Sequence, residues 1–344
     1  MGRHPRKPSP RTGLVMLRSI FMMTLVAGWL GHPAAAAAPQ NQEPRKQALE
    51  VVATIPDLAD ICVAIGGDAV RVKTLVPAGN DPHAVLPKAS LLLQLQRSDI
   101  LLLMGLDYEH AFLPPLLEKV RNPRVLPDGE GYVNVSARIR ALEVPANLDR
   151  GAGADLHPRG NPHFNLDPER VRVAALAVRD ALIAADPGRR EQFSSAWQEW
   201  DRKLAKRLDL WEAYLKPLQG KPLVSYHRSW SYFADRFELE LLGEVEPKPG
   251  LRPSPRHLAE LATSMRDQQA RVLLMEPWYP RSDVEKLLQI TGAELVVCAT
   301  TCGATRDTMH YIDWMDHLVE HVGRAYGRPT LAAFEAERAG TPDE

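Results

Sequence analysis

The chain has 344 residues with 42 basic and 43 acidic side chains, and 45% of its residues are hydrophobic. Its length allows two ordinary domains with cores of their own. Because five basic and no acidic residues lie in the first 38, the rest of the chain has a net charge of −6, which argues against nucleic acid as a partner.

The first 38 residues have the order of a secretory signal peptide. A basic region is followed by the short apolar run 20–30 and then by the small residues 34–38. The apolar run is too short for a good membrane span. We therefore expect an exported protein whose signal peptide covers 1–38 and whose next segment, 39–48, is a flexible polar arm.

The following part of the chain alternates predicted strands and helices, as α/β folds do. The run 100–104 is continuously apolar, which is typical of a strand covered on both faces of a parallel sheet. Strands are expected at 49–55, 70–75, 100–104 and 124–126, and helices at 56–65, 88–96 and 112–120.

Two long consecutive helices are predicted next, at 168–185 and 189–215. The first has Asp167 as its N-cap and Pro168 at its first position. Such a pair favours a rigid connection over a flexible linker. The second block then repeats the alternation, with strands at 222–226, 240–242, 271–275 and 294–298, helices at 229–237, 253–269, 282–291 and 308–325, and a short helix in the tail.

Three histidines share a setting that suits a metal ligand. His83 and His163 each follow a proline, in Asp-Pro-His and Asn-Pro-His, and His227 follows the predicted strand 222–226. Proline fixes its own backbone and extends the residue before it, so these imidazoles are presented from stiff chain. The carboxyl end of a strand is where α/β sheets bind ligands. Any single one of these is more simply an ordinary loop histidine, so the hypothesis rests on all three together.

At this point the sequence resembles the zinc- and manganese-binding proteins of bacterial ABC importers, of the ZnuA and TroA type. The likeness runs from about residue 50 to 325. Five stretches carry it, in the family's order: Thr74–Ser90, Asn161–Pro168, Ser225–Phe233, Met275–Tyr279 and Tyr311–Met315.

The resemblance implies an α/β fold of two lobes with mainly parallel sheets, joined by a long rigid helix, with the metal held between the lobes. It also implies a periplasmic protein that delivers its metal ion to an inner-membrane permease. The expected division is an N-terminal lobe at 49–165, a spine helix and a following helix at 166–218, a C-terminal lobe at 219–328 and a tail at 329–344.

The fourth ligand is where the chain departs from the family. By the resemblance, His83 and His163 come from the first lobe and His227 from the second. Many relatives have an aspartate after the last strand, but this chain reads Cys-Ala-Thr-Thr-Cys at 298–302. A carboxylate from Glu276, a thiolate from Cys298 or a water remain as alternatives, and we favour Glu276. Alternatively, the Glu276 carboxylate binds no metal and only accepts hydrogen bonds at the end of its strand.

Three neutral imidazoles favour Zn(II), because Mn(II) prefers more oxygen ligands. His157, in the glycine-rich loop 151–160, is interpreted either as an additional capture residue or as a solvated one. Cys298 and Cys302 either form a disulfide or stay free. Five histidines on predicted helices are interpreted as surface or packing residues: His110, His257, His310, His317 and His321.

Together with the resemblance, these residues predict a monomeric binding protein for zinc, without enzymatic activity. A manganese-specific protein or a metal-dependent adhesin of the same fold is the first alternative. An exported zinc hydrolase with Glu276 as its general base is the second, because three histidines and a bound water also form catalytic sites. The absence of a His-Glu-x-x-His motif and of a second metal cluster counts against the hydrolase.

Overall fold

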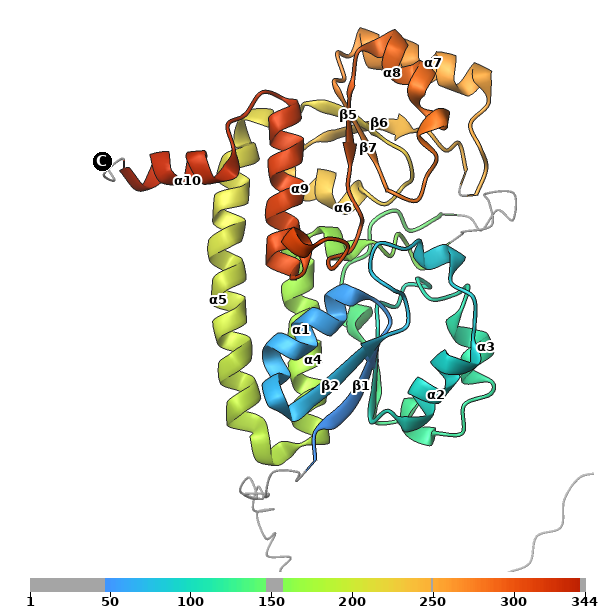
Figure 1. The fold of residues 1–344 in the computed structure, drawn as a ribbon, viewed down its shortest axis with the longest axis vertical. Coiled ribbons are helices and arrows are strands. Elements are labelled where there is room, and N and C mark those ends of the chain that lie inside the picture. Colours follow the sequence, from blue (N-terminus) through green and yellow to red (C-terminus); the bar gives the residue numbers. More distant parts are fainter. Residues whose placement is uncertain (1–46, 147–156, 249, 341–344) are drawn as a thin grey trace, which may run out of the picture. The chain divides into compact units, whose positions relative to one another are not determined.

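The structure is a computed structural model that describes residues 47–146, 157–248 and 250–340 (Figure 1). The predicted signal peptide at 1–38 and most of the predicted arm at 39–48 lie outside the described residues. Among the helices that are described, none is long and apolar enough to cross a membrane.

The first lobe is built on a parallel sheet of four strands in the order β2-β1-β3-β4. Strand β3, whose continuously apolar sequence predicts a strand covered on both faces, is central in this sheet together with β1. Helices α1 and α2 pack against β1. The elements are β1 (Leu49–Ala53), α1 (Pro56–Gly66), β2 (Val70–Thr74), α2 (Ala89–Arg97), β3 (Ile100–Leu103), α3 (Leu113–Leu117) and β4 (Tyr132–Asn134).

The predicted strand at 124–126 is wrong. The segment Pro123–Val125 forms a 3-10 turn, and the side chain of Asn122 accepts a hydrogen bond from the backbone of Arg124 to cap it. A proline has no N–H to donate to a ladder, and an asparagine two residues before a backbone donor closes a local turn instead. The edge strand β4 forms later, at Tyr132–Asn134.

The second lobe repeats this plan with a parallel sheet in the order β6-β5-β7-β8. The predicted α/β class with parallel sheets is therefore confirmed, and most element ends shift by only a few residues. The elements are β5 (Pro222–Ser225), α6 (Ser231–Phe237), β6 (Glu240–Glu244), α7 (Pro255–Asp267), β7 (Val272–Met275), α8 (Glu285–Thr291) and β8 (Glu294–Val297).

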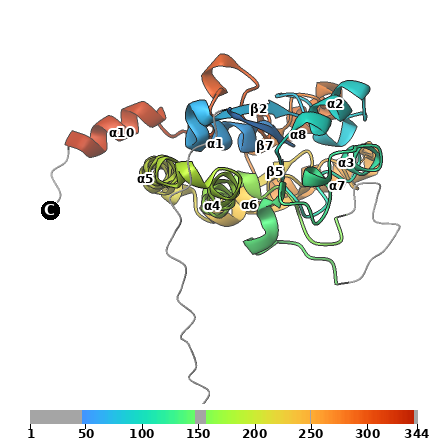
Figure 2. The ribbon, with the colours of Figure 1, turned by 90° about the horizontal axis from the view of Figure 1, so that it is seen from below.

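Two long helices, α4 (Pro168–Ala185) and α5 (Arg190–Leu215), run side by side between the two blocks of sequence (Figures 1 and 2). Helix α5 packs against α1 of the first lobe and against α9 (Tyr311–Ala325), which follows the second sheet. Helix α5 therefore contacts elements from both blocks of sequence and supports both. The predicted tail helix is present as α10 (Leu331–Gly340). The boundaries assigned above to lobes, spine and tail stay predictions.

Asp167 anchors the start of α4 and ties it to the second lobe. Its carboxylate accepts from the backbone of Glu169 as the predicted N-cap, and it forms ion pairs with Arg170 and with Arg236 of α6. The side chain of Asp167 is fully buried. A buried carboxylate is tolerated only when its charge is paired and its oxygens are hydrogen-bonded, and both conditions hold here.

We expect Asp167→Ala to lower the free energy of unfolding by about 3 kcal/mol, because it removes a helix cap and leaves two guanidinium groups without their shared carboxylate. Chemical denaturation of the metal-free protein measures this. Glu199→Ala is the matched control, since the pair of Glu199 with Arg202 on α5 is exposed. An equal effect of the two substitutions would contradict the anchoring role of Asp167.

Candidate metal centre

The side chains of interest follow the carboxyl ends of parallel strands in both sheets. His83 comes after β2, His227 after β5, Glu246 after β6 and Glu276 after β7. Such strand ends are the common ligand sites of open α/β sheets, because the connecting loops converge there. His163 joins them from the segment that precedes α4.

The two Asx-Pro-His turns have the same local geometry. The side-chain oxygen of Asp81 accepts a hydrogen bond from the backbone N–H of His83 at 2.9 Å, and that of Asn161 accepts from His163 at 3.0 Å. In each turn a short polar side chain closes a loop onto the residue two positions later. The proline between them fixes its own φ angle, so each turn constrains the backbone that carries the imidazole.

The structure brings His83, His163 and His227 together. The centroids of their rings are 5.7 Å apart in each of the three pairs. One ligand atom of each lies within 4.8 Å of the other two, and His163 and His227 are buried. A tetrahedral zinc ion with Zn–N bonds of 2.0–2.1 Å holds its nitrogens about 3.3 Å apart, so small side-chain adjustments suffice for one ion to bind all three.

Hydrogen bonds fix the tautomers of two of these imidazoles. His163 Nδ1 lies 2.9 Å from Asn161 Oδ1, and His227 Nδ1 lies 2.6 Å from Glu246 Oε2. Both partners are acceptors, so each Nδ1 carries the proton and each Nε2 keeps its lone pair for a metal. Carboxylates and carbonyls in this position orient the ligand ring and raise its basicity.

Asn161 also connects the segment of His163 to the turn of His227. Its amide nitrogen donates to the carbonyl oxygen of Arg228 at 2.8 Å and to the Glu143 carboxylate at 2.9 Å. The backbone carbonyl oxygen of Asn161 accepts a hydrogen bond from the hydroxyl of Tyr232 on α6 at 2.7 Å. Asn161 is buried, so these bonds are shielded from water and hold the two histidine segments in a fixed relation.

Glu276 is fully buried but does not belong to the cluster of three histidines. Its Oε1 accepts a hydrogen bond from Trp230 Nε1 at 3.1 Å. Burial raises the pKa of this carboxyl to about 7, against the opposing effects of nearby His227 and of hydrogen bonds from Ser229 and Trp230. Its role as the fourth ligand stays a prediction.

The structure argues against both roles considered for the cysteines, a disulfide between Cys298 and Cys302 and a metal-binding thiolate of Cys298. Cys62, Cys298 and Cys302 are all free and buried, so the 298–302 disulfide is absent. Burial raises the pKa of the Cys298 thiol to about 12, which disfavours the thiolate that a metal needs. Its Sγ donates to the carbonyl oxygen of Ala299, and it is not part of the histidine cluster.

A second group of potential ligands adjoins the first. His83, His110 and His157 also have ligand atoms within 4.8 Å of one another. The expectation of no second cluster is therefore wrong for the described residues. His110 is exposed, as expected of a surface residue, but the helix expected there is wrong. His110 lies in the turn between β3 and α3, next to His157 from the glycine-rich loop.

Sequence reasoning missed three residues that position the ligands: Asn161, Tyr232 and Glu246. Asn161 lies in the Asn-Pro-His motif, but its link to the turn of His227 depends on tertiary contact. Glu246 follows a predicted strand at 240–242, as His227 follows its own strand, and that shared position in the second sheet was the available signal.

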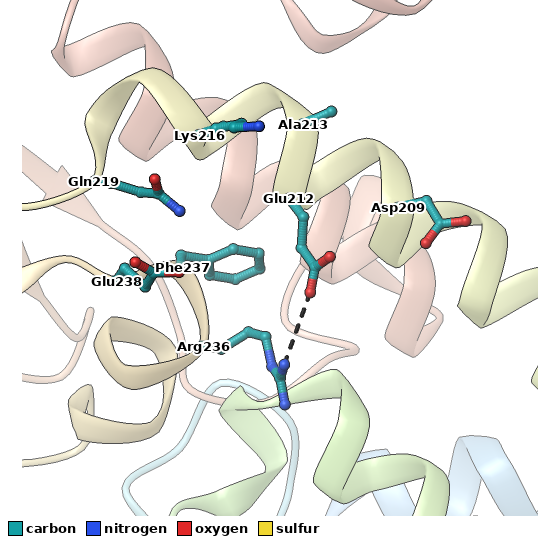
Figure 3. A pocket seen from close by; sticks show the side chains of 8 residues that line it. All are labelled: Asp209, Glu212, Ala213, Lys216, Gln219, Arg236, Phe237 and Glu238. Atoms are coloured by element: carbon teal, nitrogen blue, oxygen red, sulfur yellow. Dashed lines mark ion pairs between the residues drawn. The ribbon is translucent and has the colours of Figure 1, made fainter.

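A separate hollow of about 440 Å³ lies between the end of α5 and α6 (Figure 3). Glu212 and Arg236 approach to 3.7 Å across it. Its lining contains no histidine, so it is distinct from the cluster. The lining residues are Asp209, Glu212, Ala213, Lys216, Gln219, Arg236, Phe237 and Glu238.

Known proteins resemble this chain in sequence. The family model of the periplasmic zinc-uptake complex component A matches residues 51–325. The high-affinity zinc uptake system protein ZnuA of Yersinia pestis is 24% identical over 240 residues, which cover 67% of this chain and 76% of that protein. The manganese ABC transporter substrate-binding lipoprotein PsaA of Streptococcus anginosus is 24% identical over 249 residues, which cover 70% and 76%.

Known structures resemble it in fold. A zinc-bound deletion mutant of ZnuA matches with a TM-score of 0.69 at 24% identity, over 81% of this chain and 98% of that chain. The two α/β lobes are thus a known architecture. Because the family model spans most of its length, the chain belongs to the family of the periplasmic component A of zinc-uptake complexes.

Proposed function

We propose that this chain captures a divalent metal ion in the periplasm, zinc in preference to manganese, and delivers it to the permease of an ABC importer in the inner membrane. The observation that supports it most is the convergence of His83, His163 and His227 from three separate segments. The predicted signal peptide at 1–38 supports export. The relatives named above include both zinc and manganese proteins, so the choice of metal rests on this chain's own ligands.

The preference for zinc follows from the chemistry of the ligands. Imidazole nitrogens suit zinc, whereas manganese favours carboxylate, carbonyl and water oxygens. All three proposed ligands are nitrogen donors, and the nearby carboxylate of Glu246 serves His227 as a hydrogen-bond acceptor. A manganese site would need more oxygen atoms facing the ion than this cluster presents.

Binding without catalysis also fits the geometry better than hydrolysis. A zinc hydrolase needs a carboxylate that faces a metal-bound water as general base. The candidate base, Glu276, is buried and bonded to Trp230 Nε1, outside the cluster. All three proposed ligands come from one chain, so the site needs no second copy and we propose a monomer.

We expect the wild-type protein to bind one zinc ion per chain at nanomolar or tighter affinity, and His163→Ala to lose this tight equivalent, because two nitrogens hold zinc far less well than three. Competition with a chelator, run with Zn(II) and Mn(II) side by side, measures both. His321→Ala on α9 is the control. Tight manganese binding with weak zinc binding would reverse the preference, and binding of neither would end the importer proposal.

Glu246→Gln is expected to weaken zinc affinity about tenfold or more while the protein keeps its fold, because the amide cannot supply the negative charge that makes His227 a better donor. The same chelator competition measures it. Glu244→Gln is the matched control: Glu244 ends β6 and pairs with exposed Arg228. Equal affinities of the two variants would show that Glu246 does not act on the site.

Glu276→Gln tests the predicted fourth ligand. Because the carboxylate lies outside the three-histidine cluster, we expect the variant to keep one tight zinc per chain and to lose less affinity than His163→Ala. Glutamine keeps the shape and an acceptor for Trp230 Nε1, which guards against misfolding. A loss as large as that of His163→Ala would make Glu276 a ligand, and a small loss would leave the fourth position to water.

A further inference from the structure

The second group of histidines lies on the solvent side of the first. His110 is exposed, His83 and His157 are partly buried, and His163 and His227 are buried. The ring centroids of the outer group are 5.4–6.1 Å apart, close to the spacing of the inner group. His83 belongs to both groups, so a path of imidazoles leads from the surface to the buried cluster.

The turn that carries His110 is built for a specific shape. Gly105, Leu106 and Asp107 all have positive φ angles, which ordinary side chains rarely adopt. A Cβ on Gly105 would lie 2.1 Å from Asn134 Oδ1, so only glycine fits there. The buried carboxylate of Glu109 holds the turn by accepting from the backbone of Met104 and Gly105.

Polar contacts orient His110 and join its turn to that of His157. His110 Nδ1 donates to the backbone carbonyl oxygen of Asp107 at 2.9 Å, so its Nε2 carries the lone pair that can bind a metal, as in His163 and His227. The Asp107 side chain pairs at 3.3 Å with Arg159, two residues beyond His157. The Asp107 carboxylate also offsets the positive charge of Arg159, which would otherwise repel a metal ion near His157.

We propose that His83, His110 and His157 form an outer site that takes Zn(II) from solution and passes it through His83 to the inner cluster. Transfer exchanges His110 and His157 for His163 and His227 while His83 is retained, so the ion is never without protein ligands. The outer site deepens the proposed zinc capture and rests on it for the destination of the ion, but its existence as a binding site is tested independently.

The first experiment is a Zn(II) titration of the double variant His163→Ala/His227→Ala, in which the inner cluster keeps only His83. We expect one residual zinc equivalent, weaker than that of the wild type, and a further loss of about tenfold or more when His110→Ala is added. Circular dichroism and thermal melts of the metal-free proteins verify the fold. No residual equivalent, or one that survives His110→Ala, would overturn the outer site.

The second experiment leaves the inner ligands intact and follows the rate of zinc loading by stopped flow. We expect His110→Ala and His157→Ala each to slow loading about tenfold relative to wild type, and His321→Ala to load at the wild-type rate. Loading at the wild-type rate in both site variants would overturn the transfer role. Failure of the wild type to bind zinc tightly would end the proposed function, while the residual equivalent would still decide the outer site.

Discussion

The hydrogen bonds of one buried amide, that of Asn161, hold the proposed metal site in shape. Its oxygen fixes the backbone and ring of His163, and its nitrogen bonds to the carbonyl oxygen of Arg228, the residue after His227. A buried amide must satisfy all its groups, because each unmet bond costs about 1–3 kcal/mol. The two histidine segments therefore cannot move apart without leaving these groups unpaired. The backbone segments of His163 and His227 are therefore held together before any metal binds.

The parallel sheets explain why such distant residues meet. In each sheet the carboxyl ends of all strands lie at one edge, and the loops that follow β2, β3, β5, β6 and β7 carry His83, His110, His227, Glu246 and Glu276. His157 and His163 come from the segment between β4 and α4. Helix α5 contacts α1 and α9 and so supports both lobes along its length. The site depends on this arrangement more than on any one motif.

The sequence predicted His83 and His163 because their turns are encoded locally, by a proline and a preceding Asp or Asn. It predicted His227 because that residue directly follows an apolar strand. It did not predict the role of His110, because the turn at Gly105–Asp107 has backbone angles that propensities do not foresee and that depend on contacts with Asn134. The strand expected at 124–126 failed for a local reason, since Asn122 and Pro123 favour a turn there. The Glu276 side chain is oriented by the hydrogen bond that it accepts from Trp230 Nε1, a tertiary contact that no spacing rule reveals.

If the chain binds zinc as proposed, the ion would bridge the segments of His163 and His227, which Asn161 already joins. A ligand that binds only the folded, assembled site stabilises it by RT ln(1 + [L]/Kd), so tight zinc would add to the hydrogen bonds that hold His163 and His227 together. Release to a permease would then require that these segments be separated or that the ion leave through His83, the ligand nearest the solvent side. His83 is partly exposed and lies between His110 and the buried pair His163 and His227. Release through His83 would therefore leave the buried hydrogen bonds of Asn161 intact.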